Sequence, residues 1–151
     1  MASVMAALPL ALGLALGAAP GAARAEWRAK FELFVDDVEA STRFYETLGF
    51  RVAHVKPSDR YTTMERDGVV VALSPLPRWL PPLRWLGFLR LPPLGTEIVL
   101  YPDDLETLRA SLVRAGYSPG EVRLQPWGQR DFRLRDPSGY YVRLSEGGPI
   151  P

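Results

Sequence analysis

The side chains that could carry chemistry in this chain of 151 residues are restricted, because it has no cysteine and one histidine, His54. Disulfides, a thiol nucleophile, cysteine-bound zinc and any site built from two or more histidines of one chain are therefore excluded. Arg143 is the most informative remaining residue, because it lies in the predicted strand 140–145 among aromatic and apolar neighbours. An arginine there either forms an internal ion pair or binds an anionic or polar group of a ligand.

The elements that position Arg143 belong to a duplicated unit. Residues 34–50 align without a gap to residues 101–117, which places Asp36 on Asp103 and Gly49 on Gly116. Matches at these positions indicate an internal repeat, because aspartate is common where helices begin and glycine where they end.

Each half of the repeat predicts the same element order. An alternating strand (30–35 in the first half, around 98–100 in the second) precedes a helix that is expected to begin at Asp36 or Asp103, with glutamate three residues later. Three extended segments follow each helix. The sequence therefore predicts an α+β fold of tandem βαβββ modules that form a cup-shaped mixed sheet. The expected extended segments are 50–55, 61–65 and 69–73, then 122–124, 131–135 and 140–145, with turns at 66–68 and 136–139.

Composition is that of an ordinary globular protein, with 47% hydrophobic and 23% charged residues, and the net charge of +1 gives no argument for nucleic-acid binding. Residues 1–25 differ from the rest. They form an apolar leader of the signal-peptide type that ends in Ala23-Arg24-Ala25, or an extension without function from a mis-assigned start codon. The protein is exported in the first case and cytoplasmic in the second.

An apolar insertion, residues 76–95, separates the predicted modules 28–75 and 96–147. Within 78–94, arginine recurs every sixth residue between tryptophan, leucine and proline residues, a composition unlike that of a polar linker. Three interpretations are open. The segment supplies a dimer surface, forms a hydrophobic lid in which Trp79 or Trp85 stacks on a flat ligand, or docks to a membrane surface.

Two stretches resemble the vicinal oxygen chelate superfamily, which contains glyoxalase I, extradiol dioxygenases, and the fosfomycin and bleomycin resistance proteins. FELFVDDVEASTRFYETLGFRV is similar to the first strand and helix of that superfamily, and QPWGQRDFRLRDPSGYYVRLSE to the closing strands of bleomycin resistance proteins. The resemblance covers residues 28–147 apart from the insertion. It implies the glyoxalase/bleomycin resistance fold, but the superfamily contains both enzymes and drug-sequestering binding proteins.

The resemblance also implies where a metal would be held. The four ligand positions of metal-dependent members fall on Lys30, Ala72, Glu97 and Arg143, of which Glu97 alone can bind a metal ion. We therefore expect no metal centre, no cofactor and no catalytic residue. Instead, Lys30 and Arg143 are expected to approach Glu97 inside the cup, either as a structural ion pair or as a site for an anionic group.

The sequence thus favours a metal-independent binding protein of the bleomycin-resistance type. It would sequester an aromatic or amphiphilic small molecule as a homodimer, with the cup formed within one chain or between two. A metal-dependent glyoxalase-like lyase or isomerase, or a dioxygenase, is the alternative, and a partner- or membrane-docking module acting through residues 78–94 is a further one. The expected ligand-binding residues are Lys30, Phe34, Tyr61, Trp79, Trp85, Glu97, Tyr101, Trp127, Tyr141 and Arg143.

Overall fold

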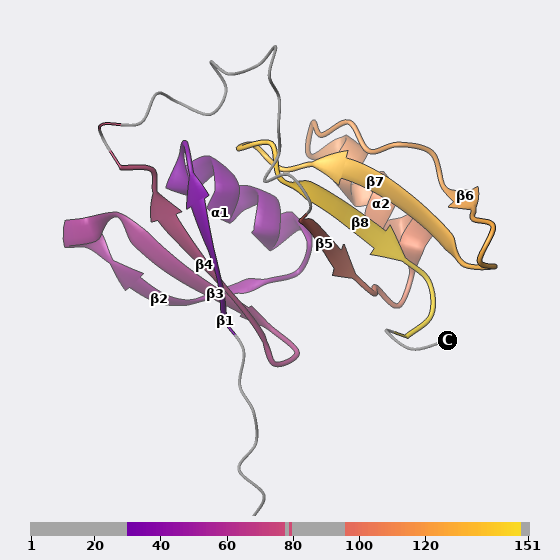
Figure 1. The fold of residues 1–151 in the computed structure, drawn as a ribbon, viewed down its shortest axis with the longest axis horizontal. Helices are drawn as coiled ribbons and strands as arrows, with labels where there is room; N and C mark the ends of the chain where they lie inside the picture. Colours follow the sequence, from indigo (N-terminus) through magenta and orange to yellow (C-terminus); the bar gives the residue numbers. More distant parts are fainter. Residues whose placement is uncertain (1–29, 78, 80–95, 149–151) are drawn as a thin grey trace, which may run out of the picture.

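The computed structural model describes residues 30–77, 79 and 96–148, which form two βαβββ modules (Figure 1). The leader 1–25, Trp85 and almost all of the insertion lie outside the described residues. The first module comprises β1 (Lys30–Val35), α1 (Val38–Thr47), β2 (Arg51–Lys56), the 3-10 helix η1 (Pro57–Asp59), β3 (Tyr61–Arg66) and β4 (Val69–Pro75). The second comprises β5 (Glu97–Leu100), α2 (Leu105–Arg114), β6 (Arg123–Leu124), β7 (Arg130–Arg135) and β8 (Tyr141–Ser145). The predicted tandem α+β fold is therefore confirmed.

The two sheets have the same topology. Their strand orders are β1-β4-β3-β2 and β5-β8-β7-β6. In each sheet the first strand pairs in parallel with the last, and the other pairings are antiparallel. The repeat seen in the sequence is thus a repeat of whole mixed sheets.

Both helices begin one residue later than the sequence suggested. Asp37 and Asp104, rather than Asp36 and Asp103, are the N-caps, and their carboxylates accept hydrogen bonds from the backbone N–H groups of Ala40 and Thr107. The adjacent aspartates made either register possible, and the cap is the one whose backbone is extended while the next residue is helical. Gly49 ends the first helix segment with a φ of +87°, as predicted, a conformation that glycine adopts without strain.

The β3–β4 hairpin turns at Asp67 and Gly68, which both have positive φ. Such a pair matches the right-handed twist of the flanking strands, so the turn predicted at 66–68 is confirmed. The observed strands differ from the expected segments by one or two residues at their ends. The largest difference at one end is at β4, which extends to Pro75.

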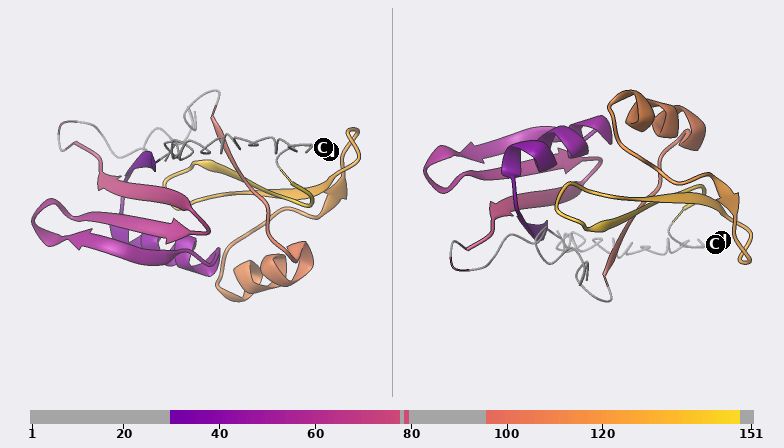
Figure 2. Two further views of the ribbon diagram at one scale, coloured as in Figure 1. Left: turned by 90° about the horizontal axis from the view of Figure 1, so that it is seen from below. Right: turned by 90° about the horizontal axis from the view of Figure 1, so that it is seen from above.

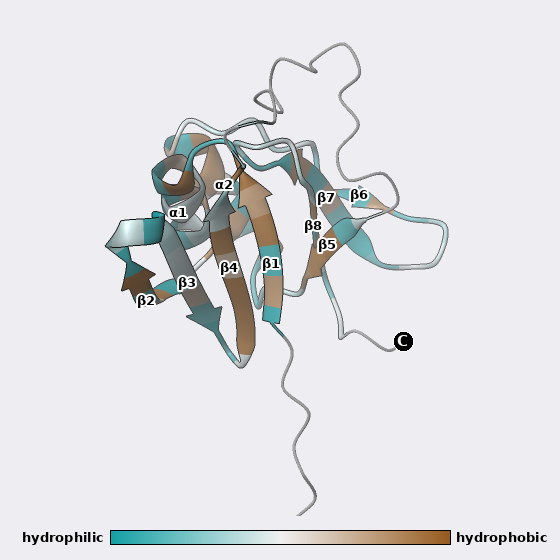
Figure 3. Cartoon of the chain, turned by 60° about the vertical axis from the view of Figure 1, so that its left-hand side comes forward, coloured by the Kyte–Doolittle hydropathy of each residue, from teal (hydrophilic) through white to brown (hydrophobic). Residues whose placement is uncertain are grey.

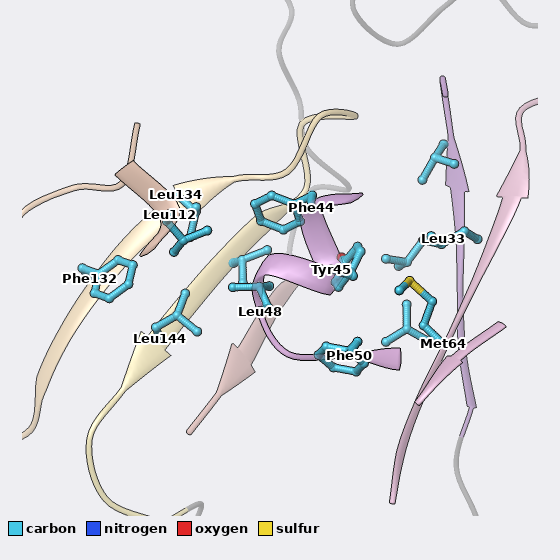
Figure 4. Packing of buried hydrophobic residues seen from close by; sticks show 14 of the residues in the cluster. Leu33, Phe44, Tyr45, Leu48, Phe50, Met64, Leu112, Phe132, Leu134 and Leu144 are labelled. Atoms are coloured by element: carbon cyan, nitrogen blue, oxygen red, sulfur yellow. The ribbon is translucent and has the colours of Figure 1, made fainter. Parts of the chain in front are cut away.

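One hydrophobic core joins the modules. Helix α1 carries Phe44 and Leu48 toward hydrophobic residues of the second module, and Tyr45 toward Leu33 of the first sheet (Figure 4). The Phe44 ring also meets Tyr117 edge-to-face, with 5.0 Å between ring centroids. The packing of α1 on both modules therefore fixes them relative to each other.

Two hydrogen bonds reinforce this contact near the end of β1. The backbone N–H of Asp36 donates to the hydroxyl of Ser138 at 3.0 Å, and the Tyr140 hydroxyl donates to the carbonyl of Phe34 at 3.1 Å. The turn between β7 and β8 is thus tied to the first module.

Helices α1 and α2 lie on the same side of the molecule in both views of Figure 2. We call the sheet face opposite the helix of its module the open face. Figure 3 shows that β4 is hydrophobic along most of its length, whereas β7 has hydrophilic residues in alternation. Neither described helix has the length and hydrophobicity needed to cross a bilayer.

Candidate functional site

The open face of the first sheet carries Lys30, Glu32 and Phe34 from β1, because alternate residues of a strand point to opposite faces. Register places Ser74 of β4 beside Phe34. The Lys30 ammonium donates a hydrogen bond to the Tyr61 hydroxyl at 3.0 Å and lies 3.5 Å from the Glu32 carboxylate. These contacts form a polar cluster with Phe34 exposed beside it (46% exposed).

The polar groups of this cluster change one another's proton affinity. The hydrogen bond between Lys30 and Tyr61 raises the pKa of the ammonium and lowers that of the phenol, since the bond stabilises the charged form of each. The Ser74 hydroxyl donates to Glu32 at 2.6 Å and lowers the pKa of that carboxyl. Glu32, Tyr61 and Ser74 also line a surface pocket of about 450 Å³ with Lys56.

The open face of the second sheet carries an ion-pair network. Its centre is Glu97 at the start of β5, whose carboxylate lies 2.8 Å from Nε of Arg133 and 3.5 Å from Nε of Arg143. Register places Arg133 of β7 directly beside Arg143 of β8. Two guanidinium groups from neighbouring strands therefore share one carboxylate.

A second carboxylate completes the network. Asp131 is buried (1% exposed) and lies 3.5 Å from Arg133 and 3.9 Å from Arg143. The side-chain amide of Gln125 donates to its Oδ1 at 2.7 Å. A buried carboxylate is stable only with such partners, so the two arginines and two acids form one unit in which the charges balance.

Trp127 lies in the loop before β7 and packs against this network. The guanidinium carbon of Arg143 is 5.7 Å from the centre of the Trp127 ring, and the tryptophan remains 54% exposed. The loop folds back through a hydrogen bond from the Gln125 N–H to the Gln129 carbonyl at 2.8 Å. The open face thus presents an arginine–tryptophan pair to a ligand.

Tyr141 shares this face with Glu97, since the two residues are register partners. Its hydroxyl accepts a hydrogen bond from Arg135 at 2.6 Å, and the guanidinium carbon lies 4.8 Å from its ring centre. Tyr141 is therefore paired with Arg135 on this face, as Trp127 is paired with Arg143.

Within one chain, the structure brings together part of the predicted charge cluster. Arg143 does approach Glu97, but Lys30 binds Glu32 and Tyr61 on the other sheet, and the second cation at Glu97 is Arg133. Aligning strands does not determine which sheet faces meet within a chain. Glu32, two residues from Lys30 on the same face of β1, supplies its carboxylate partner.

The residues at the implied metal positions do not suit a metal ion. Ala72 has no donor atom, and the Glu97 carboxylate is already shared by two arginines. Across residues 30–77, 79 and 96–148, no three His, Cys, Asp or Glu side chains gather as metal ligands would.

The other predicted site residues lie apart from these clusters. Tyr101 follows β5 and lines an apolar cleft of about 190 Å³ between the modules, with Leu48 and Phe50. Trp79 is 80% exposed. Sequence reasoning missed Glu32, Arg133 and Arg135, although their alternation with buried residues in β1 and β7 was a signal that could have identified them.

Comparison with known proteins agrees with this architecture. A family model described as bleomycin resistance protein-like N-terminal matches residues 29–66. A bleomycin-binding protein solved in complex with bleomycin has 22% identity, a TM-score of 0.61, and coverage of 82% of this chain and 100% of its own. TnmS3, an antibiotic binding protein from Streptomyces sp. CB03234, has 22% identity, a TM-score of 0.63, and coverage of 83% and 98%.

A third solved structure, from Sphaerobacter thermophilus DSM 20745, is a member of the glyoxalase/bleomycin resistance protein/dioxygenase superfamily. It has 27% identity, a TM-score of 0.59, and coverage of 81% of this chain and 98% of its own. The search of curated proteins gave no match. The family model supports the resemblance to the superfamily over residues 29–66, and the solved structures confirm the fold.

Proposed function

We propose, on the premise that this chain has the fold of the glyoxalase/bleomycin resistance protein/dioxygenase superfamily, that it binds an aromatic or amphiphilic small molecule without a metal ion. Two of its structural neighbours are a bleomycin-binding protein and an antibiotic binding protein, which supports a binding role rather than a particular ligand. In this proposal the protein sequesters the molecule and leaves it chemically unchanged.

The observation that carries the proposal is the state of Glu97. It is the one potential ligand among the four positions that metal-dependent members use, and Arg133 and Arg143 hold it in ion pairs. A divalent cation placed there would compete with two guanidinium groups and would meet their repulsion. Aromatic rings beside these cations offer stacking surfaces in place of metal coordination.

The proposed ligand site draws on both open faces. Phe34 and Tyr61 come from the first sheet, whereas Trp127, Tyr141 and Arg143 come from the second. No hydrogen bond, ion pair or ring contact joins these two groups among the residues the structure describes. We infer that a second copy of the chain completes the site, so that an open face of each copy contributes to one cup.

The direct test is native mass spectrometry of the full-length protein purified under mild conditions, with metal analysis of the same sample. The proposal expects a dimer that carries a small organic molecule and less than stoichiometric zinc, nickel, manganese or iron. Unfolding the sample releases the molecule for identification. A stoichiometric transition metal contradicts metal independence, and a monomer contradicts the two-chain cup.

A substitution separates a specific site from general hydrophobic binding. Trp127→Ala should reduce the fraction of protein that carries the molecule, because it removes an exposed ring packed on Arg143. Val113→Ala is the matched control, since Val113 is an exposed apolar residue on α2, away from both open faces. Equal occupancy in the two variants would count against the site.

A further inference from the structure

The positive charge of the second open face is not fully balanced. The open face carries arginine at positions 133 and 135 of β7 and 143 of β8. Arg133 and Arg143 share Glu97 and Asp131, and the two cations are therefore balanced by two carboxylates. Arg135 differs, because no carboxylate of residues 30–77, 79 and 96–148 lies within ion-pair distance of it.

The contacts of Arg135 are with a phenol. Its Nη2 donates to the Tyr141 hydroxyl at 2.6 Å, and its guanidinium carbon is 4.8 Å from the Tyr141 ring centre. These contacts orient the guanidinium but leave its charge in place, since a neutral phenol supplies no counter-ion. A guanidinium has five N–H donors in a planar fork, so several remain for a ligand.

A surface pocket of about 360 Å³ lies at this position. It is lined by Ser118, Arg133, Leu134, Arg135 and Tyr141. The hydroxyl of Ser118 and that of Tyr141 add donors suited to an oxyanion, and the ring of Tyr141 adds an apolar wall. The pocket therefore combines one unbalanced positive charge, hydroxyl donors and an aromatic surface.

We propose that Arg135 and Tyr141 form an oxyanion subsite, and that the small molecule bound by this protein carries a carboxylate, sulfonate or phosphate group. This inference rests on the proposed function, which places the ligand on the same open face. The guanidinium of Arg135 binds the oxyanion, and the balanced Arg133–Glu97–Arg143–Asp131 network beside it preserves the shape of the sheet. The subsite thus distinguishes an anionic aromatic ligand from neutral and cationic ones of similar size.

The test compares two fluorescent probes that differ by one charge. Anilinonaphthalene sulfonate is an aromatic anion, and N-phenylnaphthylamine is the same ring system without the sulfonate. Arg135→Met keeps the length of the side chain and removes its charge. We expect this variant to weaken sulfonate binding about tenfold or more, and to change binding of the neutral probe less than about twofold.

Arg123→Met is the matched control. Arg123 lies on β6 of the same sheet and is paired with Glu121 at 3.6 Å, so its charge is already balanced. The Arg123→Met substitution should weaken binding of the sulfonate probe less than about threefold. Far-ultraviolet circular dichroism and the thermal midpoint verify that both variants are folded.

The outcomes separate the inference from the proposed function. Failure of the unmodified protein to bind either probe contradicts both. Two results would overturn the oxyanion subsite alone, provided that the neutral probe binds saturably. Either Arg135→Met leaves sulfonate binding unaffected, or Arg123→Met weakens it as much as Arg135→Met does. Equal weakening of both probes by Arg135→Met also overturns it, because the residue would then act through packing rather than charge.

Competition experiments against the sulfonate identify the head group. Naphthoate, naphthyl phosphate and neutral naphthamide are compared at constant ionic strength, so that screening is the same in each. The stronger anionic competitor shows whether carboxylate or phosphate is preferred. Naphthamide that competes as strongly as both anions refutes the subsite.

Discussion

Asp136, at the turn between β7 and β8, should make the protein less stable as the pH rises from acid toward neutral. Its side chain is buried, and Oδ1 accepts hydrogen bonds from the backbone N–H groups of Ser138 and Tyr140 at 2.9 and 2.8 Å. Oδ2 has no hydrogen-bond partner among the described residues. Burial raises the pKa of this carboxyl from 3.8 to about 6, against the opposing effect of the backbone donors.

The sign of the effect follows from proton linkage. Because the pKa is higher in the folded state, the folded protein binds the proton more tightly than the unfolded chain does. Stability is greatest below the unfolded pKa of 3.8 and is lost as the pH rises through about 6. At about 1.4 kcal/mol for each pH unit of difference, the loss is about 3 kcal/mol at most.

The variant Asp136→Asn cannot ionise, yet its side-chain oxygen can still accept the two backbone hydrogen bonds. Urea unfolding of both proteins at several values between about pH 4.5 and about pH 7.5 gives their difference in free energy of unfolding. That difference should shift in favour of the variant by about 2 kcal/mol across this range. Asp67→Asn, in the exposed β3–β4 turn, is the control. A difference between Asp136→Asn and the unmodified protein that is constant with pH would show that burial of Asp136 does not raise the pKa of its carboxyl.

Two further predictions concern the same equilibrium measurement. Gly49→Ala should destabilise the protein more than Gly116→Ala. Both positions have a φ of +87°, which costs an alanine about 1 kcal/mol. Only at Gly49 would the new Cβ also lie 2.7 Å from another side chain, that of Arg66. Equal losses would mean that the neighbouring arginine moves away freely. Glu97→Ala should lower the free energy of unfolding by about 1 to 3 kcal/mol, and more than Lys30→Ala, because it leaves two arginines without a shared carboxylate. A larger loss from Lys30→Ala would contradict the network described at Glu97.

The sequence predicted the modules well, because the signals involved are local. The strand 30–35 was found with its observed bounds, since the apolar residues Phe31, Leu33 and Val35 recur at every second position. The helix ends were found from Gly49 and Gly116, whose left-handed backbone glycine favours. The predicted N-caps of both helices were one residue too early, because consecutive aspartates offer two possible caps.

The candidate site was predicted less completely, because it depends on pairing between strands far apart in the sequence. Arg143 was correctly expected beside Glu97, which follows from their places in the first and last strands of one module. Within one chain Lys30 pairs with Glu32 instead of Glu97, since the alignment does not show how the two sheets face each other. Arg133 and Arg135 were overlooked because charged residues that alternate along a strand usually face solvent.

The central claim is that this protein binds an aromatic small molecule without a metal ion, and one titration tests it most directly. Fluorescence titration with N-phenylnaphthylamine is performed on full-length protein before and after exhaustive treatment with EDTA. We expect saturable binding with the same dissociation constant in both samples, and a larger dissociation constant for Trp127→Ala. Binding that disappears with EDTA and returns with zinc, nickel, manganese or iron would contradict it.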